Sequence, residues 1–210
     1  MVSPVRYLCF SSLLGIVALS SAFQSPRTLS LRSVPLWRSS LSNSASEDAE
    51  AHMAENYPSC YDLLSKNGDA MKKINKSGIG FTVFAPNEAA FAELGEKKQE
   101  QLVDERNGEV SEKIALYHVI LEPVSADDLF NSGGVITEGG EVLSERSVSG
   151  GFFGVGGKED GGVTMNGAKV VKTLEFEDDK KKGFIHETDG FISPSILWRY
   201  ADQLRIPGTS

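Results

Sequence analysis

The order of apolar and polar positions changes from a two-residue to a helical period within residues 80–94, GFTVFAPNEAAFAEL. Phe81 and Val83 would lie on one face of a strand, and Thr82 and Phe84 on the other. All four are β-branched or aromatic, which is typical of a strand that is covered on both faces. We therefore predict a fully buried strand at the start of this stretch.

The second half of the same stretch predicts a helix. Pro86 has no N–H for a strand ladder, and it disfavours the helical conformation at Ala85. Asn87 is a favourable N-cap, and Glu88 suits the positive end of a helix dipole. Apolar residues then recur at helical spacing, at Ala90, Phe91 and Leu94.

The residues before this corner predict helices that share an apolar stripe. Ser59 is placed to cap the first helix, with Asp62 three residues later as in a capping box. The stripe consists of Leu63, Leu64, Met71 and Ile74. Ahead of it, the acidic and polar residues 47–54 predict a disordered segment, in which His52 would be solvated.

Further helices are predicted after the corner. Residues 96–106 form a charged helical stretch with Leu102 and Val103 as its anchors, and Asn107-Gly108 is its expected C-terminal stop. The next helix has one continuous apolar face made of Val110, Ile114, Tyr117, His118 and Leu121. Pro123 is expected to end it. A short helix is then predicted from Ser125, its cap, with Asp128 at the third position.

From residue 135 onward the pattern predicts short strands. The expected runs are 135–136, 141–143, 152–153, 162–165 and 169–171. Glycine pairs separate several of these runs, and Asn166-Gly167 predicts a tight hairpin turn. The charged run 175–182 predicts a solvated loop. Residues 183–194, GFIHETDGFISP, are the last ordered element expected, and they close with a proline.

Several separated segments resemble the signatures of the fasciclin (FAS1) domain family. The first signature is carried by Thr82, Val83, Phe84, Ala85, Pro86, Ala90 and Phe91. Tyr117-His118 resembles the family's tyrosine–histidine pair, and Asn166-Gly167 lies in a segment that resembles its hairpin. The second signature is carried by His186, Asp189, Gly190 and Pro194. Glu187-Thr188 and Ser193 depart from it, since the family usually has apolar residues there.

The resemblance implies an α+β fold, a FAS1-type wedge or sandwich of about seven short strands with several helices packed at one side. It covers residues 55–198 as one domain without an internal repeat, and it leaves 199–210 as a C-terminal tail. It further implies a non-enzymatic interaction module that binds a protein or glycan partner and holds no cofactor. The residues of the two signatures, the tyrosine–histidine pair and the hairpin would then be mainly structural.

The charge of the chain narrows the classes of partner. The formal net charge is −8, yet residues 1–46 hold four arginines and no acidic residue. The remaining residues carry 17 basic and 29 acidic side chains, a net charge of −12. This negative charge repels nucleic acid and anionic lipid, and we expect neither as a partner. Cys60 would be a lone thiol after removal of the leader, and we expect it to be a small buried apolar residue.

The first 46 residues have the composition of targeting segments. Arg6 precedes an apolar run of 15 residues, 8–22. This run is shorter than the roughly 20 residues that a membrane span needs, and we predict a signal peptide over 1–22. Residues 23–46 contain eight serines, three arginines and no acid, which is typical of a transit peptide. Together the two segments resemble the two-part plastid address of diatom-like algae.

Two interpretations of the leader remain open. In the first, the mature chain works in the plastid, in the stroma rather than the lumen, as a scaffold or accessory subunit docked on a photosynthetic membrane complex. In the second, residues 23–46 are a disordered linker in a secreted adhesion or matrix protein. The sequon at Asn75 would then be a glycosylation site. Neither interpretation places a transmembrane segment in the mature chain.

The sequence offers few side chains for catalysis or metal binding. His52, His118 and His186 are the three histidines, and none has metal-ligand spacing to another histidine or cysteine. We expect His118 to be a core residue that donates a ring N–H to a backbone carbonyl, and the alternative is an adhesion contact. His186 with Asp189 and Ser193 supports only a remote hydrolase hypothesis. We therefore predict no catalytic, cofactor-binding or metal-binding residue.

Overall fold

The computed structural model describes residues 44–67, 69–149 and 158–203. The predicted signal peptide, most of the predicted transit segment and the predicted strand 152–153 lie outside these residues. The helices are α1 (Ala45–Asn56), α2 (Pro58–Lys66), α3 (Asp69–Lys76), α4 (Glu88–Leu94), α5 (Glu96–Val103), the 3₁₀ helix η2 (Glu105–Asn107), α6 (Gly108–Tyr117), α7 (Ala126–Asn131) and α8 (Ser195–Gln203). The strands are β1 (Gly80–Pro86), β2 (Val119–Ile120), β3 (Gly134–Ile136), β4 (Glu141–Ser149), β5 (Lys158–Met165), β6 (Ala168–Glu177) and β7 (Lys182–Thr188).

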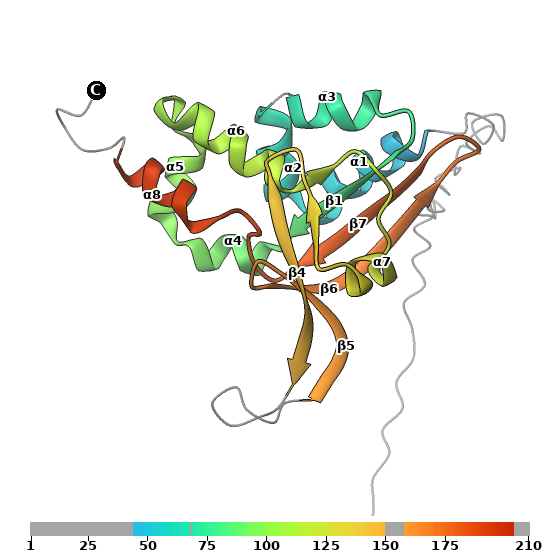
Figure 1. Cartoon of the computed structure of the whole chain (residues 1–210). Helices are drawn as coiled ribbons and strands as arrows, with labels where there is room; N and C mark the ends of the chain where they lie inside the picture. Colours follow the sequence, from blue (N-terminus) through green and yellow to red (C-terminus); the bar gives the residue numbers. More distant parts are fainter. Residues whose placement is uncertain (1–43, 68, 150–157, 204–210) are drawn as a thin grey trace, which may run out of the picture. The chain divides into compact units, whose positions relative to one another are not determined.

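The strands form one mixed sheet in the order β2-β1-β7-β6-β5-β4-β3 (Figure 1). β1 and β7 are parallel, in register from Gly80↔Lys182 to Pro86↔Thr188, and the other pairs are antiparallel. Every residue of β1 is buried, which confirms the predicted strand with two covered faces. The predicted α+β class, with about seven short strands and several helices, is also confirmed.

Two apolar clusters divide the interior. The larger joins the helices α1, α2, α3 and α6 to one face of β1 and β7, and its centre includes Leu64, Phe81 and Ile185. The smaller lies on the strands β4 and β5 and includes Phe84, Leu129 and Met165. Phe81 and Phe84 belong to different clusters, so β1 divides the two clusters because alternate side chains of a strand point to opposite faces.

The prediction of disorder at residues 47–54 is wrong, because this segment is part of α1. Ser44 and Glu47 form a capping box at its start, and Ala49 and Met53 are fully buried. Acidic side chains therefore cover only the outer side of a helix whose inner side is apolar. His52 is only half-buried, and its ring lies against Phe176 with 5.6 Å between the ring centroids.

The predicted start of the next helix is also corrected. α2 begins at Pro58, with Tyr57 at the N-cap and no side-chain cap. Ser59 lies inside the first turn, and its hydroxyl and N–H donate instead to the carboxylate of Glu88, at 2.7 and 3.1 Å. A proline at the first helical position starts a helix without a capping side chain, because its fixed φ suits the helix.

The charged helix differs from its prediction in its buried residues and its end. α5 stops at Val103, whose side chain is 62% exposed, whereas Gln101 is buried. Asn107 and Gly108 do not end a helix: Asn107 closes the turn η2, and Gly108 opens α6. The amide of Asn107 donates to the Gln101 carbonyl at 3.1 Å, so this residue joins the two helices.

The helix predicted to run to Pro123 ends earlier, at Tyr117. The next residues change to β2, in which Ile120 pairs with Thr82. The change occurs because β1 has a free edge with which residues 119–120 pair. A helix that continued through Leu121 would leave this edge of β1 unpaired. Helical spacing alone could not reveal it, because His118 and Leu121 fit the helix period as well.

Two further segments are more ordered than predicted. Only residues 178–181 of the charged run 175–182 form the predicted loop, because β6 continues to Glu177 and β7 begins at Lys182. Leu174 and Phe176 alternate with its acidic residues and pack on the larger cluster. The predicted tail from 199 is helical to residue 203, since α8 buries Ala201 as well as residues before it.

The predicted caps and turn are confirmed. The side chain of Asn87 accepts from the Ala90 N–H at 2.9 Å, and Ser125 and Asp128 form a capping box on α7. Asn166-Gly167 turns β5 into β6 with φ values of 47° and 93°, a conformation that asparagine and glycine adopt most readily. Within the described residues, no helix has the length and apolar content to cross a membrane.

Candidate functional site

The residues of the first signature join β1 to its neighbours. Thr82 donates to the Glu122 carbonyl and accepts from the Val124 N–H, both at 2.8 Å, so its buried hydroxyl fixes the loop after β2. Val83 and Ala85 are fully buried in the larger cluster, and Pro86 ends the strand. Phe91 packs edge-to-face on the ring of Phe191, which follows β7, with the two ring centroids 4.9 Å apart.

His118 lies fully buried at the end of α6. Its Nδ1–H donates to the Ile114 carbonyl at 2.8 Å, and its Nε2 accepts from the Ile192 N–H at 3.4 Å. The ring is neutral in this arrangement, because one nitrogen donates and the other accepts. Burial lowers the pKa of His118 to about 4. The predicted donation to a backbone carbonyl is thus present, and the imidazole links α6 to the segment after β7.

His186 is also fully buried, and it lies within the strand β7. Its Nε2–H donates to the Val124 carbonyl at 2.9 Å, and its Nδ1 accepts from the Thr173 hydroxyl at 2.9 Å. Its ring stacks on Phe84 with centroids 5.4 Å apart. Burial lowers the pKa of His186 as well. Both ring nitrogens are therefore used inside the fold, where they hold β7 to β6 and to the loop after β2.

The remaining signature residues bracket the β5–β6 turn. Asn166 accepts from the Leu143 N–H at 3.0 Å and donates to the Ile192 carbonyl at 2.9 Å. Asp189 accepts from the Lys169 N–H at 2.6 Å. Gly190 lies against Ala168, where an added Cβ would approach to 3.3 Å. The hairpin and the second signature are thus tied together, and Pro194 follows at the entrance to α8.

Tyr117 lies on the surface side of the tyrosine–histidine pair and is half-buried. Its backbone and ring pack against Gly139 and Gly140, where any Cβ would come closer than 3.0 Å. The Lys113 ammonium lies 6.0 Å from its ring centroid. The pair therefore points in two directions, with His118 inward and Tyr117 toward the loop before β4.

The segment that carries these residues matches the model of a known protein family. The fasciclin domain model matches residues 55–194. The chain belongs to the fasciclin family.

This fasciclin chain has a relative and a structural neighbour of limited coverage. It is 33% identical over 131 residues to Protein sll1483 of Synechocystis sp., across 62% of this chain and 64% of that protein. The chain therefore spans less than two thirds of that relative's length. It is also similar to the structure of a FAS1 domain pair from the insect cell adhesion molecule Fasciclin I, which was described as a novel fold. That match has 18% identity and a TM-score of 0.42, over 71% of this chain and 56% of the other.

The fasciclin domain does not assemble the trio of the remote hydrolase hypothesis. The two ring nitrogens of His186 are bonded to Thr173 and Val124, as described above. Asp189 is exposed and binds a backbone N–H, and the Ser193 oxygen accepts from the Trp198 indole at 3.2 Å. Within the described ranges, no group of three histidine, cysteine or acidic side chains is placed to hold a metal ion.

Cys60 is a free thiol buried in α2, as predicted. Burial, with a smaller contribution from Glu88, raises its pKa to about 12. The thiolate is the reactive form of cysteine, so burial disfavours reaction of this thiol.

A groove between α2, α4 and α5 is the feature that sequence reasoning missed. It has a volume of about 320 Å³. Leu63, Phe91 and Leu102 form its apolar floor, and Asp62 and Glu88 are on its rim. No motif marks this groove, since its residues come from three helices and are shared with the core stripe. The sequence predicts Val103 to be a buried anchor, but the residue is highly exposed. This exposure is a local sign of the groove.

Proposed function

We propose that this chain is a non-enzymatic interaction module that binds a protein or glycan partner. The observation that carries the proposal is the state of its two signature histidines. His118 and His186 are buried and neutral, and each uses both ring nitrogens within the fold. The most versatile acid–base groups of the domain are thereby committed to structure, which leaves recognition to the surface. Membership in the fasciclin family supports the same conclusion.

The proposed place of action is the plastid stroma, where the domain would be a scaffold or accessory subunit docked on a photosynthetic membrane complex. The support is the sequence of residues 1–46, an apolar run followed by a segment rich in serine and arginine. A net charge of −12 on the remaining residues favours a partner with a basic surface, because opposite charges speed and orient association.

The partner test is a pull-down with the chain lacking residues 1–43 as bait, from isolated plastids and from the secreted fraction. We expect one plastid protein or complex in stoichiometric yield, which rebinds the purified bait in solution. An unrelated domain of equal net charge is the control for non-specific attraction. Failure to recover a rebinding partner from either fraction would overturn the proposed function.

The alternative function is secreted cell adhesion or a role in the extracellular matrix. The observation in its favour is the position of Asn75, which is exposed at the end of α3 and accessible to a glycan. A fluorescent fusion of residues 1–46 separates the two functions. Plastid fluorescence supports the first function, and fluorescence in the endoplasmic reticulum or at the cell surface supports the second.

A further inference from the structure

The sheet opens between β5 and β6. These strands pair at only two positions beside their turn, Thr164↔Lys169 and Met165↔Ala168. Beyond them β5 follows β4 through a register shift, where Gly161 has a φ of 79°, whereas β6 follows β7. Figure 1 shows β4 and β5 turning away from β6 and β7 below α7. The two strands therefore diverge from a common turn.

Within the part of the chain that the structure describes, one edge of β6 has no strand partner over residues 172–177, and Val171 lies at a register shift between β6 and β7. Among the residues that the structure describes, this part of β6 pairs with β7 alone. A free strand edge presents a row of backbone N–H and C=O groups, and these groups bind an extended chain. At about 3.3 Å per residue the open edge is roughly 20 Å long, enough for a segment of about six residues.

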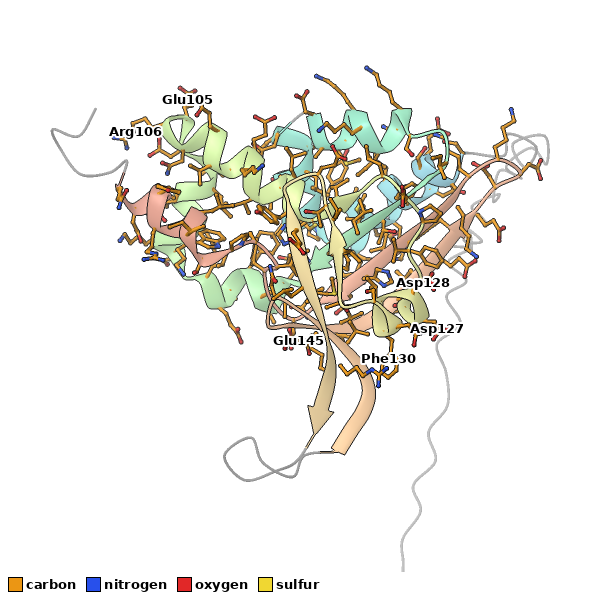
Figure 2. All side chains as sticks on the ribbon, viewed as in Figure 1. Glu105, Arg106, Asp127, Asp128, Phe130 and Glu145 are labelled. Carbon is orange, nitrogen blue, oxygen red and sulfur yellow. The ribbon has the colours of Figure 1, made fainter. Side chains whose placement is uncertain are left out.

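An apolar cleft lies at the start of this edge. It has a volume of about 420 Å³ and is bounded by α7, β5 and β6. Its apolar lining consists of Leu129 and Phe130 of α7, Val163 of β5, and Val170 and Val171 of β6, and Thr173 adds a polar side chain. The Arg146 guanidinium lies 4.6 Å from the Phe130 ring centroid. Figure 2 shows Phe130 projecting from α7 on the side where β5 departs. The Val171 side chain is 57% exposed, so the cleft is open to a ligand.

Carboxylates lie at both ends of the open edge. Asp127 of α7 lines the cleft and is exposed, and Glu177 is exposed at the far end of β6. Lys172 lies between them and also lines the cleft. Glu177 lies opposite Lys182 of β7, which balances its charge, whereas Asp127 favours a ligand with a basic side chain at the cleft end.

We propose that the open edge of β6 and this cleft, together called the β6 groove, bind an extended segment of a partner protein by β-strand addition. One large apolar side chain of the segment fills the cleft, and a basic side chain lies toward Asp127. The inference rests on the proposed function, since it specifies how a protein partner is held. Main-chain pairing supplies the affinity, and the cleft and Asp127 supply the selectivity.

The first test uses a synthetic probe peptide, acetyl-Arg-Thr-Phe-Thr-Val-Thr-Lys-amide, with binding to the purified chain measured by fluorescence anisotropy. Two further versions carry N-methyl groups on alternate backbone amides, one version for each edge of the peptide. We expect saturable binding that at least one N-methylated version loses by about ten-fold or more, a difference of about 1.4 kcal/mol. Binding of both methylated versions as tight as that of the unmodified peptide, or no binding of the unmodified peptide at millimolar concentration, overturns the inference.

The second test places the peptide on the protein. Val171→Lys fills the mouth of the β6 groove and adds a repelling charge, and we expect it to weaken binding about ten-fold or more. Ile136→Lys is the matched control, because Ile136 is also an exposed strand residue, at 80%, on the edge strand β3. Thermal melts verify that both variants fold. Equal binding by wild type and Val171→Lys overturns the inference.

The outcomes separate this inference from the proposed function. If the pull-down yields a rebinding partner but the peptide does not bind, the interaction module stands and the β6 groove is not its docking site. If the peptide binds as expected but neither fraction yields a partner, the β6 groove binds extended peptides and the cellular function proposed for it fails.

Discussion

His118 and His186 show at the residue scale why a fold retains a polar ring in its interior. A buried polar atom without a partner costs about 1–3 kcal/mol, and each ring avoids this cost by making two hydrogen bonds. One bond of each ring crosses to a segment that is distant in sequence, 62 residues away for His186 and Val124 and 74 residues away for His118 and Ile192. An apolar residue of the same size could fill the space but could not make these connections.

The pH dependence of stability follows from the pKa of His118. The pKa is about 4 in the folded chain and about 6.5 in the unfolded chain, so the unfolded chain binds more protons between these values. Stability should therefore fall as the pH drops from about 6.5 to 4, by about 3 kcal/mol from this residue. Urea unfolding at several pH values measures it. A His118→Gln variant, which lacks the titration, should show a shallower slope, and equal slopes would contradict the assignment.

Phe84 makes a separate test of the smaller cluster. Its side chain is fully buried between that cluster and the His186 ring. Phe84→Ala should cost about 3–5 kcal/mol, because it removes apolar contacts and leaves a cavity. Chemical denaturation gives this value, with Val171→Ala, an exposed position in β6, as the control. A melt identical to wild type would show that Phe84 lies outside the core.

The helix α1 shows at the element scale how surface composition can hide an ordered segment. Its residues are mostly acidic or small, yet the capping box at Ser44 and the buried Ala49 and Met53 dock it on the sheet. The Tyr57 hydroxyl at its end donates to Glu187 of β7 at 2.9 Å. Burial, with this bond, raises the pKa of Tyr57 to about 12. α1 is therefore part of the domain, which begins ahead of the family match at residue 55.

Truncation of Met53 tests this role of α1. Met53→Ala should destabilise the chain by about 2–5 kcal/mol, since the side chain is fully buried in the larger cluster. Glu55→Ala is the control on the exposed side of the same helix, where we expect a change within about 0.5 kcal/mol. Equal stability of the two variants would contradict the packing of α1 and would support the disordered segment that its composition suggested.

The parallel pairing of β1 with β7 organises the whole molecule, because it joins strands that are about a hundred residues apart. The two signatures meet along this pair, where Phe84 of the first signature pairs with His186 of the second. Gly183 allows the approach, since any Cβ there would come closer than 3.0 Å to the ring of Phe81. Long-range pairing of this kind makes the strands and the helices that cover them a single cooperative unit.

Gly183→Ala tests the packing between β1 and β7. The added methyl group must displace a buried aromatic ring, and overpacking of this kind costs about 1–3 kcal/mol. Gly78→Ala is the matched control, because nothing lies within 4 Å of a Cβ at that position. Thermal unfolding should show a clear loss for the first variant and little change for the second. Equal melting temperatures would contradict the register of the pair.

The sequence alone determined the features that depend on near neighbours. The buried strand β1, the caps at Asn87 and Ser125 and the turn at Asn166-Gly167 follow from local sterics, capping and period. The α+β class followed from the resemblance to the family signatures, and the expectation that His118 is a core residue bonded to a carbonyl followed from its place on an apolar helix face.

Only the tertiary structure decided the features that depend on distant partners. The strand β2 replaces the end of a helix because β1 offers it an edge, and α1 is ordered because the sheet offers it an apolar face. The groove between α2, α4 and α5 and the β6 groove likewise each bring together elements that are separated in sequence, α2 with α4 and α7 with β5. Pattern and spacing encode local preference, whereas these choices depend on free energy gained when segments many residues apart meet.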